Sequence, residues 1–359
     1  MNLRDVLTGA VVMAPMTKGS NLPYRRLCVE LGARVTMSEM TVARRLKQRR
    51  KGEFALIRKF EGEPFFGVQL AGTNPEEIGW AAALAESRGA DLVDLNCGCP
   101  IDHFTHKGLG AALGRQPQRI RRIVESMKKS VTRIPVTVKL RLGWNDETRN
   151  VIEQARAAVD GGADAITVHG RTRNARYRFD ADWDAIGSVV AAVPVPVVGN
   201  GDILVPDDVT RARERSGCVG VMSARGVLMK PWLFREMNDG YRDLDANERI
   251  GIYRRYVTLA REHWGEDEYG LERVRQFTRW HIDFWHRYAP RHADGTFPSI
   301  QVRETERHFV SPLDAFLARP DTPALEYLAD CLTHQREIDV AAAPAPDANA
   351  DAEFVEAEG

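Results

Sequence analysis

Short apolar runs alternate with amphipathic segments from residue 10 to residue 237, and this alternation restricts the possible fold more than any other feature of the sequence. The runs have the length of strands and are almost continuously apolar, as parallel strands buried on both faces must be. Eight such runs occur, at residues 10–16, 34–40, 65–72, 92–98, 135–143, 165–171, 196–202 and 218–226.

Helical patterns lie between these runs, for example over residues 75–89 and 147–162, where apolar residues recur every three or four positions and the pattern ends near glycine. Eight strand–helix units over roughly 230 residues suit a closed (β/α)8 barrel, whose usual size is about 250 residues. The sequence therefore predicts an α/β fold with a TIM barrel over residues 1–239.

The rhythm changes after Asn247, where only helical patterns follow. We expect an all-helical domain over residues 240–339. Its last segment leads into residues 340–359, which are rich in Ala and Pro and carry five acids and no base, so we expect a disordered acidic tail there. The expected helices of this domain cover residues 248–265, 269–288, 298–318 and 323–338.

Composition narrows the class of protein. A hydrophobic fraction of 43% and a charged fraction of 28% are typical of a globular protein. No apolar run could span a bilayer, residues 1–9 lack the layout of a signal peptide, and the five cysteines are too scattered for a disulfide framework, so we expect a cytoplasmic location. Without the acidic tail the chain carries a net charge of +5, which is compatible with a nucleic-acid partner.

Polar residues gather at the C-terminal ends of the expected strands. In a TIM barrel all these ends meet at one mouth, where such barrels place their active sites, so we predict an active site there. Gly-containing turns beside Arg225 favour a phosphate site, and the side chains on other strands could address a ring system across the mouth. The strand-end residues are Ser38, Glu39, Gln69, Asn96, Lys139, Arg141, His169, Arg171, Asn200, Gly201, Asp202, Ser223, Ala224 and Arg225.

Eight motifs, in this order and spacing, resemble the flavin-dependent tRNA-dihydrouridine synthase family. Two further segments, GCPIDHFTHKG (98–108) and residues 262–288, resemble the eukaryotic branch of that family that acts on the tRNA variable loop. The motifs are MAPM (13–16), VQLAG (68–72), DLNCGCP with KGLGAAL (94–100 and 107–113), VKLRLG (138–143), VHGRT (168–172), ADWDAI (181–186), GNGDI (199–203) and VMSARG (221–226).

The resemblance implies a reaction. An FMN-dependent oxidoreductase would reduce a uridine in tRNA to 5,6-dihydrouridine, with hydride passing from flavin N5 to C6 of the base and NADPH re-reducing the flavin. Cys99 matches the family's proton donor to C5, and a thiol with an ordinary pKa near 8.5 is protonated at neutral pH. Cys97 has no counterpart in the family pattern, although an alternating strand would bring both cysteines to one side.

The resemblance also implies roles for the remaining site residues. Cofactor binding would fall to Pro15, Met16, Thr17, Gln69, Lys139, His169, Asn200, Gly201, Asp202, Ala224 and Arg225, and weaker substrate candidates are Asn96, Lys107, Arg171 and Arg176. Ala175 stands where the family commonly has Gln. The loop 101–114, with His103 and His106, would close over a flipped-out nucleotide.

A helical domain of this kind would recognise folded RNA through a basic face. Weak candidates for that face are Arg254, Arg255, Arg261, Arg273, Arg275 and Arg279, whereas Trp264, Trp280 and Trp285 are expected in the core. We expect a monomer with tRNA as its partner, no protein partner and no membrane association.

Other interpretations fit less well. The glycines at 108–114 lie too far beyond their strand for a dinucleotide fingerprint, and Cys97 and Cys99 lack a second pair for zinc, so no metal site is predicted. Two alternatives stay open: a flavin barrel that reduces a free pyrimidine or a dihydroorotate-like molecule, and a non-catalytic RNA-binding module.

Overall fold

The computed structural model describes residues 2–302 and 308–346, and the chain divides into two compact units. The first unit comprises Met1–Leu22, Ala33–Ile203 and Asp207–Ala224, and the second comprises Pro23–Gly32, Leu204–Pro206 and Arg225–Gly359. The domain boundary expected after residue 239 stays a prediction, as does the tail, of which residues 347–359 lie outside the described part of the chain.

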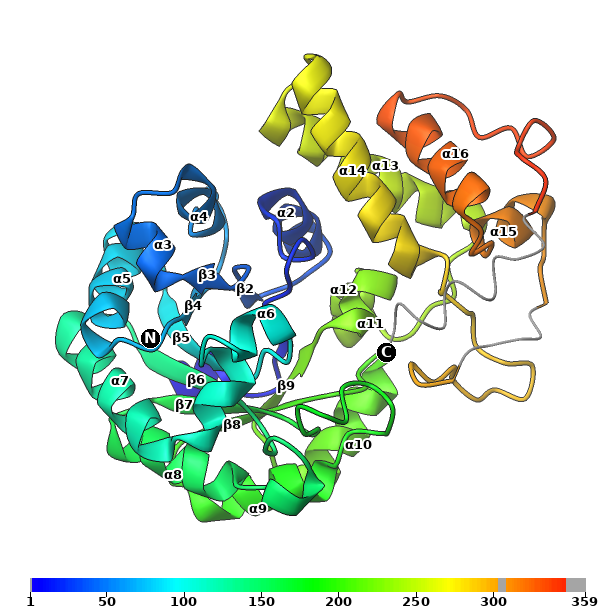
Figure 1. Cartoon of the computed structure of the whole chain (residues 1–359). Coiled ribbons are helices and arrows are strands. Elements are labelled where there is room, and N and C mark those ends of the chain that lie inside the picture. The colour runs from blue at the N-terminus through cyan, green and yellow to red at the C-terminus, as the bar shows by residue number, and fades with distance from the viewer. Residues whose placement is uncertain (1, 303–307, 347–359) are drawn as a thin grey trace. The chain divides into compact units, whose positions relative to one another are not determined.

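The first unit is a parallel β-barrel, and the predicted TIM-barrel fold is confirmed (Figure 1). Hydrogen-bonded strands follow the order β1-β9-β8-β7-β6-β5-β4-β2, with β3 also paired to β4. A parallel bridge between Val12 of β1 and Val35, the residue before β2, brings the two ends of this strand order together and nearly closes the barrel. The strands are β1 (Val11–Met13), β2 (Thr36–Met37), β3 (Thr41–Val42), β4 (Phe66–Ala71), β5 (Leu92–Cys97), β6 (Val136–Arg141), β7 (Ala165–His169), β8 (Val197–Asn200) and β9 (Gly220–Ser223).

Helices surround these strands, and their boundaries follow local capping rules (Figure 1). In α5, the Asn74 side chain accepts from the Glu77 backbone N–H and Pro75 occupies the first turn, where its missing N–H costs nothing. The helices of this unit are α1 (Leu3–Leu7), α3 (Ala43–Lys47), α4 (Lys51–Leu56), α5 (Pro75–Ser87), α6 (Asp102–Thr105), η1 (Gly110–Arg115), α7 (Pro117–Ser130), η2 (Asp146–Thr148), α8 (Val151–Asp160), α9 (Trp183–Ala192) and α10 (Pro206–Ser216).

The strands are buried on both faces, as their apolar runs predict. Every residue of β4, β5, β7, β8 and β9 is buried, and in β6 only Lys139 is partly exposed. One core cluster draws Val12, Met37, Leu92 and Met222 from four different strands. Lys139 is thus the one partly exposed residue of these six strands, although buried polar side chains such as Asp94 and Arg141 also lie on them.

The second unit is helical in its described residues, and aromatic rings form much of its core. Trp285 stacks on Tyr253 with ring centroids 4.0 Å apart, and His281 stacks on Tyr24 at 4.1 Å. Trp285 is buried as expected, whereas Trp264 and Trp280 are half-buried. The helices are α2 (Leu22–Glu30), α11 (Arg225–Met229), α12 (Leu233–Asp239), α13 (Ala246–Trp264), α14 (Glu268–Trp285), α15 (Pro312–Leu317) and α16 (Thr322–Thr333).

The helix expected over residues 298–318 is wrong for most of its length. Within the described residues it is helical only in α15, and residues 303–307 lie outside that description. The physical reason is a local start signal: the Ser311 side chain accepts from the Asp314 backbone N–H, and Pro312 sits in the first turn, where it fits, rather than in a helix interior, where it does not.

Gly220 packs closely against backbone carbonyl groups, so a substitution there tests the packing of the barrel. A Cβ at this first residue of β9 would overlap the carbonyl oxygen of Leu7 and lie 2.9 Å from that of Ala10, and neither backbone atom can easily move. We expect Gly220→Ala to lower the free energy of unfolding by about 1–3 kcal/mol in chemical denaturation. Gly52→Ala in α4, where nothing lies within 4 Å, should be neutral or stabilising; equal losses in both variants would contradict this packing.

Candidate active site

A chain of buried side-chain hydrogen bonds crosses strands β4, β5 and β6. Gln69 donates through Nε2 to Asp94 at 2.8 Å, and its Oε1 accepts from Asn96 Nδ2 at 2.6 Å. Thr137 donates to the other oxygen of Asp94 at 2.7 Å. Strand pairing places these residues side by side, because Gln69 is level with Asp94 and Asp94 with Thr137.

The turn after β5 is held by the same asparagine. Asn96 Oδ1 accepts the backbone N–H groups of Gly98 at 3.1 Å and Cys99 at 2.9 Å. Gly110, at φ +60°, packs so closely on Cys99 that a Cβ there would lie 2.9 Å from the Cys99 Cβ. These contacts fix the backbone around Cys99, whose side chain is partly exposed, whereas Cys97 is buried.

Arg141 supports this turn from β6. Its Nε donates to the Gly98 carbonyl at 2.7 Å and its Nη1 to the Thr172 carbonyl at 3.0 Å, so one buried guanidinium joins the loops after β5 and β7. Burial lowers the pKa of Arg141, but a guanidinium remains charged. The positive charge of Arg141 lies near the thiol of Cys99 and has a lowering effect on the pKa of that thiol.

Lys139 and Asn200 join β6 to β8. Lys139 Nζ donates to Asn200 Oδ1 at 3.0 Å, and Asn200 Nδ2 donates to the Met222 carbonyl of β9 at 2.8 Å. Burial, with the nearby charge of Arg141, lowers the pKa of Lys139 to about 8. This lysine can therefore lose its proton at lower pH than an ordinary lysine.

The buried Arg171 forms an ion pair with the partly exposed Asp202, next to the ends of β7 and β8. Arg171 Nη2 lies 2.7 and 2.5 Å from the two Asp202 oxygens, its Nε donates to the Phe179 carbonyl, and its Nη1 is 3.3 Å from His169 Nε2. Gly201, at φ +142°, has no room for a Cβ beside Ala181. The GNGD turn is thus tightly packed against the loop that follows β7.

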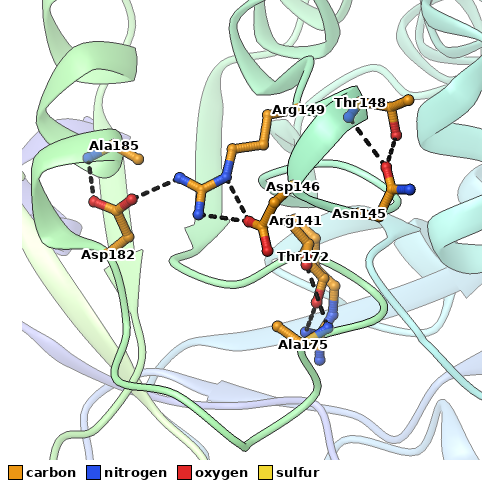
Figure 2. A network of polar contacts seen from close by, with 9 residues as sticks. All are labelled: Arg141, Asn145, Asp146, Thr148, Arg149, Thr172, Ala175, Asp182 and Ala185. Carbon is orange, nitrogen blue, oxygen red and sulfur yellow. Dashed lines mark hydrogen bonds and ion pairs between the residues drawn. The ribbon is translucent and has the colours of Figure 1, made fainter.

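Figure 2 shows how polar contacts join the loops after β6 and β7. Arg149 binds Asp182 at 2.7 Å and Asp146 at 2.7 Å, and Asp182 also accepts the Ala185 backbone N–H at the start of α9. In the same view, the Ala175 backbone N–H donates to the Thr172 hydroxyl. Ala175 therefore lies in a turn that is held by the Thr172 hydroxyl.

The remaining predicted residues lie around this network or apart from it. Pro15 and Met16 are half-buried, Thr17 is exposed, and the Met16 N–H donates to Ser20. Ala224 is half-buried directly after β9, and Arg225 is the first residue of α11 in the second unit.

The weaker substrate candidates lie in two loops. Lys107 is exposed and its Nζ is 3.0 Å from His103 Nε2. Arg176, at φ +47°, lies 3.6 Å from Asp102, which also pairs with Arg173. The loops after β5 and β7 are thus joined by charge at their exposed tips.

Sequence reasoning missed Asp94 and Thr137 as members of the site, and it placed Arg141 at the strand ends without giving it a role. Burial raises the pKa of Asp94 to about 6, although Gln69 and Thr137 donate to it. Burial also raises the pKa of Cys99, against the lowering effect of the Ile101 N–H and of two nearby cations, and raises that of Cys97 further. Both thiols are therefore protonated at neutral pH. Asp94 is an acid within a mostly apolar strand, but nothing in the sequence identified its partners.

Two negative findings apply to the described residues. Within residues 2–302 and 308–346 no group of three or more His, Cys, Asp or Glu side chains is arranged to hold a metal ion. None of the helices described there is long and apolar enough to cross a membrane.

The raised pKa of Asp94 predicts a pH-dependent stability. Because the folded state holds this proton from pH 4 to 6 and the unfolded state releases it, the free energy of unfolding should fall as pH rises through that window, by about 3 kcal/mol. Urea denaturation of the wild type minus that of Asp94→Asn should show this slope. A difference that stays flat between pH 4 and 6 would refute the assignment.

Comparison with known proteins gives the family. The family model described as dihydrouridine synthase matches residues 12–295. A "tRNA-dihydrouridine(47) synthase [NAD(P)(+)]" of Malassezia globosa is 36% identical over 340 residues, covering 87% of this chain and 44% of that protein. The human "tRNA-dihydrouridine(47) synthase [NAD(P)(+)]-like" protein is 40% identical over 287 residues. This alignment covers 79% of this chain and 44% of the human protein.

This chain thus spans less than half the length of these curated relatives. The match nevertheless extends from Val12 in β1 across the barrel strands to β9 and continues past the end of α14. On that match the chain belongs to the dihydrouridine synthase family.

Proposed function

We propose that this protein reduces a uridine in tRNA to 5,6-dihydrouridine, using FMN and taking its electrons from NADPH. Family membership and the names of the relatives support this reaction. The observation that carries it is the partly exposed Cys99 thiol in a turn fixed by Asn96 at the C-terminal end of β5. A protonated thiol at a barrel mouth suits the delivery of one proton to a substrate.

The donor set at the barrel mouth fits a flavin. Lys139, Arg141 and Arg171 supply cationic N–H groups, and Gln69 supplies an amide, around the ends of neighbouring strands. Such a set favours a ring that becomes anionic on reduction. When bound, FMN would supply the hydride that adds to C6 of the uracil.

We assign the cofactor side chains by this fit and by the family motifs. Gln69, Lys139 and His169 would face the ring and ribityl region, while Pro15, Met16 and Thr17 would line one side of it. The ribityl and phosphate end would meet Asn200, Gly201, Asp202, Ala224 and Arg225. Asp94 would keep Gln69 in one orientation, because it accepts the amide N–H and leaves the amide oxygen to Asn96.

Cys99 would donate a proton from Sγ to C5 of the uracil, and solvent would restore the thiol. Its raised pKa keeps the proton on sulfur until the base becomes basic at C5. The Asn96 amide positions the Cys99 turn through Oδ1 and binds Gln69 through Nδ2, whose second N–H would meet the uracil edge.

The substrate loop would use exposed cations. Lys107 and Arg176 lie on the loops after β5 and β7, where a flipped-out nucleotide must pass to reach the mouth. Arg171 is buried and bound to Asp202, so it would shape the pocket floor and leave the base contacts to others. We further propose that residues 240–339 form an RNA-recognition domain and that the protein acts as a cytoplasmic monomer.

The competing function is reduction of a free pyrimidine. The absorbance of the flavin distinguishes this function from reduction of tRNA. The purified protein should be yellow and bleach with NADPH, and unmodified tRNA should restore the colour at least tenfold faster than air alone. Millimolar concentrations of uracil, uridine or dihydroorotate should not accelerate the return of the colour. Rapid reoxidation by the free pyrimidines and none by tRNA would refute the proposal.

The two cysteines provide a matched pair of variants. Cys99→Ala should retain flavin and lose at least 100-fold in dihydrouridine formation, because no other thiol could supply the proton. Cys97→Ala should retain most of the activity, because Cys97 is buried. The measurement is the dihydrouridine content of tRNA by mass spectrometry, with the flavin content of each variant as the control. Loss of activity in Cys97→Ala with activity retained in Cys99→Ala would overturn the role of Cys99.

A further inference from the structure

A basic segment outside the barrel mouth takes no part in the chemistry described above. Residues 44–59 carry eight cations and one acid, Glu53, which is buried and ion-paired with Arg45 at 3.3 Å. The segment forms α3, α4 and the turn between them, where Arg49 adopts φ +57°. This charge imbalance is far larger than that of the whole chain.

The segment lines a hollow of about 820 Å³ formed with α5 and the loop before β4. Aromatic rings also reach it: Phe54, with the Arg88 guanidinium 5.0 Å from its centroid, and Trp80, which is 40% exposed. The described residues that line the hollow include no acid. Its six cations are Lys47, Arg49, Lys51, Arg58, Lys59 and Arg88.

Four of the six arginines expected to bind RNA in the helical part form ion pairs with acids. There, Arg255 pairs with Glu30 at 2.6 Å, and Arg275 pairs with Glu326 and Asp330 at 2.5 and 2.6 Å. Arg261 and Arg279 also pair with acids. In the hollow, Lys59 pairs with Asp91 at 2.6 Å, but Asp91 is not among the lining residues. Positive charge is therefore more concentrated at the hollow.

We propose that this hollow binds the phosphate backbone of RNA, with a base or ribose against the Trp80 ring. The inference rests on the proposed function for its polymer, tRNA, and adds a second binding surface apart from the catalytic mouth. Clustered cations with exposed aromatic rings are the combination that binds single-stranded segments of nucleic acid. Its concave shape fits a strand better than the flat surface of an anionic membrane.

The test is RNA binding without turnover. Lys47→Gln, Arg49→Gln and Lys51→Gln are combined, and the affinity of the oxidised protein for unmodified tRNA is measured without NADPH across a salt series. We expect affinity at low salt to fall at least tenfold and the slope of log K against log [salt] to shrink by roughly 2. Trp80→Ala should weaken binding about fivefold with the slope unchanged.

A matched control removes the same charge elsewhere in the first unit. Arg122→Gln, Lys129→Gln and Arg156→Gln lie at exposed positions of α7 and α8, and they should change affinity less than twofold. Thermal melting of each variant checks folding, and a variant that unfolds is replaced by its three single substitutions.

Three results would overturn the proposal: equal losses in both triple variants, unchanged RNA affinity in the hollow variant, or a loss confined to phosphatidylserine vesicles with RNA binding intact. Failure of the proposed function is visible separately, as RNA binding through the hollow without any dihydrouridine formed.

Discussion

The site depends on the side chain of Asn96, which uses both ends of its amide to join a strand to a turn. Its N–H group binds Gln69 on the neighbouring strand, and its oxygen holds the backbone of Gly98 and Cys99. An amide can do this because it carries a donor and an acceptor on one rigid plane. The turn after β5 is thereby set against the strand ends, and with it the only cysteine that is partly exposed among the described residues.

Beneath this turn lies a polar layer that is costly to bury and is therefore almost fully hydrogen-bonded. Asp94, Lys139 and Arg141 are ionisable groups among largely apolar strands, and each is hydrogen-bonded to residues of other strands or loops. Buried charges of this kind stabilise a protein little, but removal of one partner leaves the other uncompensated. Such a layer is better explained by the work of the site than by the needs of the fold.

Most of the barrel was predictable from the sequence, because parallel strands that are buried on both faces consist of nearly continuous apolar runs. The strand positions, the mouth and the turn around Cys99 followed from runs that end in polar residues. Asp94 did not, since an acid inside a strand has no periodic signature and its partners come from strands 25 and 43 residues away.

Helix boundaries and charge pairing were the weakest predictions. A local Ser–Pro start at Ser311 overrode the periodic pattern in front of α15. The arginines of the helical part pair with acids that are remote in sequence, such as Glu30 for Arg255, so a count of charges could not identify the basic surface.

The central claim is that Cys99 is reachable at the mouth, holds its proton, and is kept in place by Asn96. Alkylation by iodoacetamide, followed peptide by peptide in the mass spectrometer from pH 6 to 10, measures all three properties. We expect Cys99 to react before Cys97 and its reactivity to rise only above the pH at which an ordinary thiol ionises. We also expect Asn96→Ala to accelerate the alkylation of Cys99 at every pH. A Cys99 that reacts half-maximally below pH 8, or more slowly than Cys97, would contradict it.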